Sequence, residues 1–237
     1  MISAHRATAR DWDYPENALG GIERFAKAGY LMVEIDVARL KDGTHILFHD
    51  GVWDKISTAK GPIARASGND LAGILLRSRK GRLSDQRPAL LEDYLKAAKD
   101  KLYLEIDFKS SADEAAVIKA VQEAGLGDHV ILISYTKKQR ERLKALAPTM
   151  LISSGAAYAK EGDLVWIGKD ITKPERRARN QRLIGRVGRP DAATDLALAK
   201  GQAAILVTDD ANLYMPITGL TRETKAQYSD CLKQISN

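Results

Sequence analysis

Short apolar runs separated by amphipathic stretches dominate the pattern of hydrophobic and polar positions along this chain. Apolar runs of four to eight residues that are bounded by turn residues are typical of strands. Eight such strands are predicted, at Met1–His5, Leu31–Val37, Leu102–Phe108, His129–Ser134, Met150–Ser153, Leu164–Gly168, Leu183–Val187 and Ala204–Thr208. The stretches between most of them have the periodicity of helices.

The first predicted helix, Glu16–Ala28, follows Pro15 and stops at Gly29. Proline favours the first turn of a helix and glycine its end, so both boundaries carry a signal. Gly125 and Gly201 are expected to cap two of the later helices. These later helices are predicted at Leu90–Lys99, Ala112–Ala124, Lys137–Leu146, Asp191–Lys200 and Arg222–Ile235.

Eight strands alternating with helices imply an α/β protein whose parallel sheet closes into a single (β/α)₈ barrel. The length of 237 residues is normal for one such domain, so residues 1–237 are expected to form it. An open, doubly wound sheet is the alternative. However, no glycine-rich phosphate loop follows the first strand, which counts against a dinucleotide-binding fold.

A long connection, about residues 37–89, interrupts the alternation after the second strand. A connection of this length in a barrel is usually a functional insertion over the active face. It begins with a turn at Lys41–Thr44 and a returning strand, His45–Phe48, that ends at His49. The insertion therefore begins as a hairpin that brings a titratable histidine back to the second strand.

The second strand also carries two carboxylates, Glu34 and Asp36, two positions apart and hence on one face. Like charges this close raise each other's pKa unless a cation lies between them. Mg²⁺ and Ca²⁺ are the hard cations that suit oxygen ligands. A metal site is one interpretation, and an exposed strand with incidental acids is the other.

More polar residues fall at the ends of neighbouring strands, where barrel enzymes keep their catalytic groups. The first strand ends in His5 and Arg6, and the third carries Glu105, Asp107 and Lys109 with a period of two. The three side chains on the third strand therefore face the same way. We expect these groups to converge on the paired acids.

Charge and composition narrow the class of partner. The net charge of +6 favours anionic partners, and much of it lies in Arg77–Arg82 and Lys173–Arg182. A solvated surface is the commoner use of such stretches, and no nucleic-acid motif accompanies them, so no nucleic-acid partner is expected. No apolar run approaches the roughly 20 residues that cross a bilayer, so stable membrane insertion is not expected either.

A single cysteine, Cys231, excludes an intramolecular disulfide and a cysteine-based zinc site. A cytoplasmic location fits this count. A periplasmic or secreted location is the alternative if a leader has been removed.

Short motifs in a fixed order connect these observations. They are AHR (Ala4–Arg6), PEN (Pro15–Asn17), EID (Glu34–Asp36), KDG (Lys41–Gly43), HD (His49–Asp50), PALLEDYL (Pro88–Leu95), LEIDFK (Leu104–Lys109), ISY (Ile133–Tyr135) and VTDD (Val207–Asp210). Together they resemble the glycerophosphodiester phosphodiesterase family, within the phosphatidylinositol-phospholipase-C-like barrel superfamily, over almost the whole chain.

The resemblance implies a metal-dependent phosphodiesterase with one divalent ion, Mg²⁺ or Ca²⁺. His5 and His49 match the catalytic pair of the family, and Arg6 matches its phosphate-binding arginine. Glu34 and Asp36 match two of the three metal ligands.

The third ligand of the family lies two residues before a lysine, which points to Asp107 with Lys109 beside the phosphate. Glu105 is the competing choice, because it shares the face but lies one layer deeper in the barrel.

The chain also departs from the family pattern. Ala7 stands where the family usually has glycine, and Ala18 where it has threonine. Glu16 is expected to help start a helix rather than to bind metal, and Asp209 to fix a loop.

Four further residues are candidates to line the substrate site. Trp12 and Tyr14 lie in a connection that is longer than usual for the family. Trp166, at the end of the sixth strand, could equally belong to the barrel core, and Arg186, on the seventh, could form a structural ion pair.

The resemblance implies hydrolysis of a small-molecule or lysolipid phosphodiester, with glycerophosphodiesters giving glycerol phosphate and an alcohol by histidine acid–base catalysis. One alternative is a lysophospholipase D- or sphingomyelinase D-like enzyme that forms a cyclic phosphate. The other is a catalytically silent barrel that binds phosphodiesters.

Overall fold

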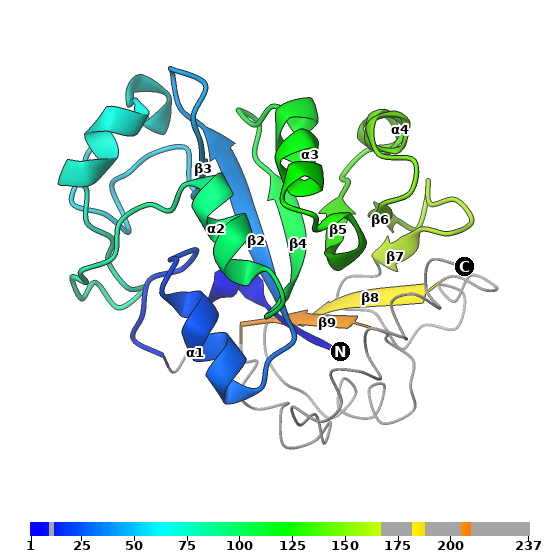
Figure 1. Ribbon diagram of the computed structural model, residues 1–237, viewed down its shortest axis with the longest axis horizontal. Helices are drawn as coiled ribbons and strands as arrows, with labels where there is room; N and C mark the ends of the chain where they lie inside the picture. The colour runs from blue at the N-terminus through cyan, green and yellow to red at the C-terminus, as the bar shows by residue number, and fades with distance from the viewer. Residues whose placement is uncertain (10–11, 167–181, 188–204, 210–237) are drawn as a thin grey trace.

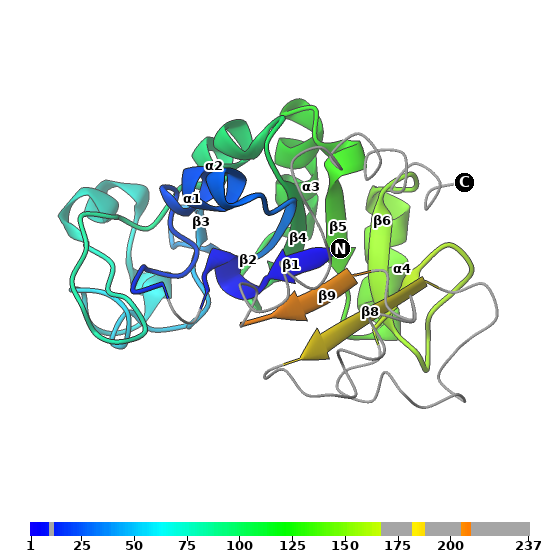
Figure 2. The same cartoon turned by 90° about the horizontal axis from the view of Figure 1, so that it is seen from below.

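Parallel strands close into a barrel in the computed structural model, which describes residues 1–9, 12–166, 182–187 and 205–209 (Figure 1). Each strand pairs with the next, and β1 pairs with both β2 and β9, which closes the sheet (Figure 2). The barrel strands are β1 Ile2–Ala4, β2 Met32–Arg39, β4 Tyr103–Phe108, β5 Val130–Ile133, β6 Leu151–Gly155, β7 Leu164–Trp166, β8 Arg182–Val187 and β9 Ile205–Thr208. The predicted (β/α)₈ barrel is confirmed, and each predicted strand overlaps an observed one.

The interior of the barrel is filled in layers. One apolar layer combines Met32, Ile131, Leu164 and Ile205, which come from β2, β5, β7 and β9. Side chains from alternate strands form such layers because the strands tilt against the barrel axis. This apolar layer fills the barrel at that level.

Four α-helices lie outside the strands in the described part of the chain (Figure 1). The helix α4, Lys137–Leu146, has the predicted bounds, while α2, Leu91–Ala98, and α3, Glu114–Glu123, differ from theirs by one or two residues. Gly29 and Gly125 end α1 and α3 with φ angles of 87° and 71°, as their sequence positions predicted. The predicted segments Asp191–Lys200 and Arg222–Ile235, with Gly201, lie outside the described residues.

The helix α1, Gly21–Ala28, begins later than the predicted Glu16. Asn17 has a left-handed backbone, with φ of 57°, and its N–H donates to the carbonyl of Arg6 at 2.8 Å. The segment after Pro15 therefore turns along the rim of the barrel instead of starting a helix, so the predicted start was wrong.

The insertion begins as predicted, with β3, His45–Leu47, antiparallel to β2. The rest of it consists of turns and two short 3₁₀ helices, Ile63–Arg65 and Gly68–Gly73. Its apolar side chains build a second core beside the barrel, which includes Phe48, Trp53, Ile56, Ile63, Leu71, Ile74 and Leu76. The insertion is thus a packed unit and can hold side chains in fixed positions.

No helix among the described residues combines the length and the apolar character that crossing a bilayer requires.

Candidate active site

A pocket of about 270 Å³ opens at the carboxyl ends of the barrel strands. Its lining brings together eight residues that the sequence selected: His5, Arg6, Glu34, Asp36, His49, Asp107, Lys109 and Trp166. Phe108, Ser110, Ile133, Tyr135 and Val207 complete it. A larger and more open groove of about 740 Å³ adjoins it along Phe108–Ser110, but it contains none of the paired acids or histidines.

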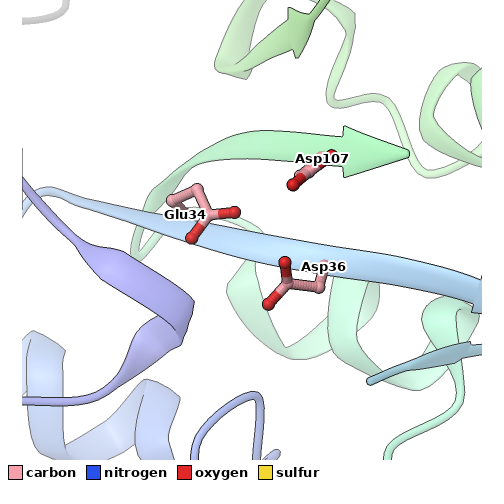
Figure 3. A group of neighbouring side chains, drawn as sticks. All are labelled: Glu34, Asp36 and Asp107. Carbon is pink, nitrogen blue, oxygen red and sulfur yellow. The ribbon is translucent and has the colours of Figure 1, made fainter. Parts of the chain in front are cut away.

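Three carboxylates form the centre of the pocket. Glu34 and Asp36 lie on β2 and Asp107 on β4 (Figure 3), and one oxygen of each lies within 4.8 Å of the others. The parallel register places Asp36 beside Asp107, and all three residues are buried. Burial, followed by the charge of Asp36, raises the pKa of Glu34 well above its usual value. An all-oxygen donor set of three neighbouring acids fits a hard divalent cation.

Glu105 is adjacent in register to Glu34 but is not part of this group. Its side chain is completely buried, and neither carboxylate oxygen has a hydrogen-bond partner among the described residues. Burial raises the pKa of Glu105 to about 7. The geometry therefore favours Asp107 over Glu105 as the third carboxylate.

Replacing Glu105 by glutamine should stabilise the metal-free protein at pH 8 but not at pH 4. The folded-state pKa is raised from 4.5 to about 7, so unfolding free energy falls as pH rises through this window. For the wild type this fall in the unfolding free energy is roughly 3 kcal/mol, and the neutral amide of glutamine does not undergo it. Urea unfolding of both proteins at the two pH values, with EDTA present, measures the difference. An equal effect at both pH values would contradict this account.

Lys109 and Tyr135 contact two carboxylates of the triad, Asp36 and Asp107. The Lys109 ammonium lies 2.7 Å from Asp36 Oδ1 and 2.8 Å from Asp107 Oδ2. Burial lowers the pKa of Lys109, but the two carboxylates outweigh it and raise the pKa above its usual value. The Tyr135 hydroxyl donates to Asp107 Oδ2 at 3.0 Å. Although the residue is 60% exposed, desolvation of the hydroxyl and the charge of Asp107 raise the tyrosine pKa.

Asn17 fixes Asp36 from the other side. Its amide nitrogen donates to Asp36 Oδ2 at 2.7 Å, and its amide oxygen accepts from the Asp36 backbone N–H at 3.2 Å. Burial alone would raise the pKa of Asp36, yet Lys109, His49 and the Asn17 amide lower it. The left-handed backbone of Asn17 is what turns the amide toward β2.

Each of the two pocket histidines, His5 and His49, has a carboxylate on its Nδ1. His49 Nδ1 lies 2.7 Å from Asp50 Oδ1, and its Nε2 lies 2.7 Å from an Arg6 guanidinium nitrogen. A guanidinium can only donate, so Nε2 of His49 accepts and Nδ1 carries the proton. His5 Nδ1 lies 2.8 Å from Asp209 Oδ1, and its Nε2 lies 3.9 Å from Glu34 Oε2.

Arg6 connects the acids with the histidines. Its backbone N–H donates to Glu34 Oε2 at 2.7 Å, and its guanidinium donates to Glu16 Oε1 at 3.3 Å. Arg6 and Ala7 have left-handed φ angles of 56° and 45°. Such backbones cost about 1–3 kcal/mol in non-glycine residues and cluster at functional sites. Glycine, which the family usually has at position 7, would adopt this conformation without that cost.

The roles of three residues in these contacts were not expected from the sequence. Glu16 does not start a helix but is buried, and it accepts hydrogen bonds from Arg6 and Arg79. Asp209 supports His5 rather than only fixing a loop; burial raises its pKa, but hydrogen bonds from His5 and Arg79 hold the pKa well below its usual value. The only sequence signal for Arg79 was its place in a basic stretch.

The other candidate substrate-lining residues lie in different parts of the structure. Trp166 lines the pocket, whereas Trp12 packs against Phe25 with ring centroids 4.7 Å apart. The Arg24 guanidinium carbon lies over the Tyr14 ring, 4.2 Å from the ring centroid. The structure thus places Trp12 and Tyr14 away from the pocket, because both fill the space between the rim and α1.

Arg186 lies on β8, of which the structure describes the backbone alone. Its backbone is in register with Val207, a residue that lines the pocket.

Comparison with known proteins agrees with this arrangement. The model of the "Glycerophosphoryl diester phosphodiesterase family" matches residues 5–169. The chain is 26% identical over 168 residues to the probable glycerophosphodiester phosphodiesterase 2 of Mycobacterium tuberculosis, covering 70% of this chain and 59% of that protein. It is 24% identical over 159 residues to the glycerophosphodiester phosphodiesterase of Caldanaerobacter subterraneus, covering 64% and 65%. The chain thus spans less than two thirds of the length of these relatives.

Two solved structures share the fold. The glycerophosphodiester phosphodiesterase of Agrobacterium tumefaciens C58 superposes with a TM-score of 0.78 at 20% identity, covering 90% of this chain and 97% of that one. A phosphodiesterase of Oleispira antarctica, in complex with the product sn-glycerol-3-phosphate, gives a TM-score of 0.72 at 19% identity, covering 92% and 96%.

Proposed function

The chain belongs to the glycerophosphoryl diester phosphodiesterase family, and on this premise we propose that it hydrolyses glycerophosphodiesters to glycerol phosphate and an alcohol. The observation that carries the proposal is the pocket itself. Within it a carboxylate triad, two cationic side chains and two carboxylate-bound histidines line one space of about 270 Å³. A phosphodiester needs these elements, because charge builds on its oxygens as the nucleophile enters in line.

Glu34, Asp36 and Asp107 would hold one divalent ion, Mg²⁺ or Ca²⁺, which when bound supplies positive charge to the phosphoryl oxygens. Arg6 and Lys109 would bind the remaining phosphate oxygens. Lys109 already lies within hydrogen-bond distance of Asp36 and Asp107, so its ammonium would meet the phosphate at the edge of the triad. Preorganised charge of this kind lowers the barrier because it needs no rearrangement during the reaction.

His49 is suited to the role of general base. Its Nε2 carries a lone pair, since Nδ1–H is directed to Asp50. Asp50 holds the imidazole in this tautomer, so Nε2, once the Arg6 guanidinium has turned to the phosphate, would accept a proton from the attacking water as the new P–O bond forms.

His5 is suited to the role of general acid. Its Nδ1 lies 2.8 Å from Asp209 Oδ1 and its Nε2 lies 3.9 Å from Glu34 Oε2, and the role of acid would use the imidazole with both nitrogens protonated. Its Nε2–H would protonate the alkoxide as the P–O bond to the alcohol breaks. The two proton transfers balance, with water consumed and the free alcohol released.

An assay of glycerophosphodiesters and lysolipids with Mg²⁺ or Ca²⁺, followed by ³¹P NMR, tests the proposal. We expect linear glycerol phosphate and a free alcohol from the deacylated diesters. A cyclic phosphate formed from a lysolipid would instead favour a phospholipase D-like enzyme. Binding of the metal without hydrolysis of any diester would favour a silent, phosphodiester-binding barrel.

A further inference from the structure

The basic stretch Arg77–Arg82 forms a rigid turn on the insertion. The Ser78 backbone N–H donates to the Arg82 carbonyl at 2.8 Å, and the Ser78 hydroxyl accepts from the N–H groups of Lys80 and Arg82 at 3.2 Å each. The Arg77 N–H donates to the Ile56 carbonyl at 2.7 Å, which ties the turn to the second core. Ser78 is buried, so the backbone of this turn has little freedom.

This turn directs Arg79 at two carboxylates of the candidate active site. Arg79 Nε donates to Glu16 Oε2 at 2.9 Å, and its Nη1 donates to Asp209 Oδ1 at 2.7 Å. Burial lowers the pKa of Arg79, but these two acids outweigh it and raise the pKa, so the guanidinium stays charged.

Both acids also support a residue that faces the pocket. Glu16 accepts a hydrogen bond from the Arg6 guanidinium, and Asp209 Oδ1 is the same oxygen that lies 2.8 Å from His5 Nδ1. Glu16 is buried with two arginines as its cationic partners, and removing one would leave its charge half-compensated. Asp209 would likewise lose the donor that fixes its rotation against His5.

We propose that Arg79 is a positioning residue for the reaction, through which the insertion holds Arg6 and His5 in place by way of Glu16 and Asp209. The inference rests on the proposed function of the pocket. The planar fork of arginine spans the two acids with fixed geometry, which the single ammonium of lysine cannot do. The insertion therefore contributes to positioning the catalytic groups.

The test compares Arg79→Gln with Arg82→Gln. Arg82 belongs to the same turn, and its guanidinium pairs with Asp13 at 2.9 Å, so it controls for loss of one charge and one ion pair. Arg79→Gln should lower kcat roughly 10- to 100-fold, the cost typical of misplacing catalytic groups by about 1 Å. Arg82→Gln should keep the wild-type kcat, and Arg79→Lys should recover only part of the loss.

Two measurements do not depend on turnover. Arg79→Gln should shift the ¹⁵N resonances of the His5 imidazole and weaken the binding of glycerol 3-phosphate, while Arg82→Gln should change neither. Wild-type kcat and unchanged His5 resonances in Arg79→Gln would overturn the proposal, as would equal losses in both glutamine variants. If the wild-type protein hydrolyses no diester, the proposed function fails, and the resonances still decide whether Arg79 positions His5.

Discussion

Replacing either His5 or His49 by alanine is expected to lower kcat by about 10²- to 10⁴-fold, the usual contribution of a general acid or base. In each variant the in-line displacement would lack one of its two proton transfers. The supporting acids Asp209 and Asp50 would remain, but they contact only the Nδ1 side of each ring. Steady-state rates with a glycerophosphodiester at saturating metal measure the effect.

His45→Ala provides a matched control for these variants. His45 lies on β3 in the same hairpin as His49, and its Nε2 accepts a hydrogen bond from the Asp113 N–H at 3.2 Å. It does not line the pocket, so this variant should lose some stability and keep its kcat. Undiminished turnover in His5→Ala or His49→Ala would end the two-histidine mechanism.

The sequence predicted the barrel well because a barrel imposes a simple pattern. Each strand has to bury both faces, so an apolar run marks it, and the observed strands lie within a few residues of the predicted ones. The carboxylate triad followed only in part from the same geometry. A period of two put Glu34 and Asp36 on one face of β2 and Glu105 and Asp107 on one face of β4, and the choice of Asp107 over Glu105 came from the resemblance to the family.

The supporting contacts could not be predicted, because they join residues far apart in the chain. Arg79 and Asp209 are 130 positions apart, and Tyr135 lies 28 positions from Asp107. No periodicity links such positions, and only the closed barrel and the packed insertion bring them together.

At one place the local sequence pattern led to a wrong prediction, the start of the first helix. Pro15 and Glu16 look like the start of a helix, yet the chain uses this segment to bind Arg6 and Asp36 through Glu16 and Asn17. A functional demand thus overrides the local preference of the sequence. Three of the four non-glycine residues with positive φ in the described part of the chain, Arg6, Ala7 and Asn17, lie in or beside this segment.

Removal of the divalent ion with EDTA is expected to abolish hydrolysis, and Mg²⁺ or Ca²⁺ should restore it. A bound divalent ion contributes several kcal/mol to stabilising charge in the transition state, which corresponds to at least about 100-fold in kcat. Glu34→Gln should be equally inactive with or without added metal. In the wild-type protein, metal at 100 times its Kd should add about 2.7 kcal/mol to the unfolding free energy, which Glu34→Gln should not gain.

The same substitution should have the opposite effect on the metal-free protein. Burial and the charge of Asp36 raise the pKa of Glu34 well above 4.5, so the folded state favours the protonated acid. Stability from this group is complete below the unfolded-state pKa and is lost as pH rises through the folded-state pKa. Glutamine avoids this loss, and Glu34→Gln should therefore unfold at a higher urea concentration than the wild type at pH 8 with EDTA.

Ser110→Ala is a matched control, because Ser110 lines the pocket without belonging to the triad. It should keep both the metal-dependent stabilisation and the wild-type stability in EDTA. The opposed effects of Glu34→Gln separate a metal site from a structural cluster: loss of metal response with gain of metal-free stability is the result expected if burial and the charge of Asp36 disfavour the ionised Glu34 until a metal ion binds. If Glu34→Gln were destabilised in EDTA and still stabilised by metal, the triad would not be the metal site.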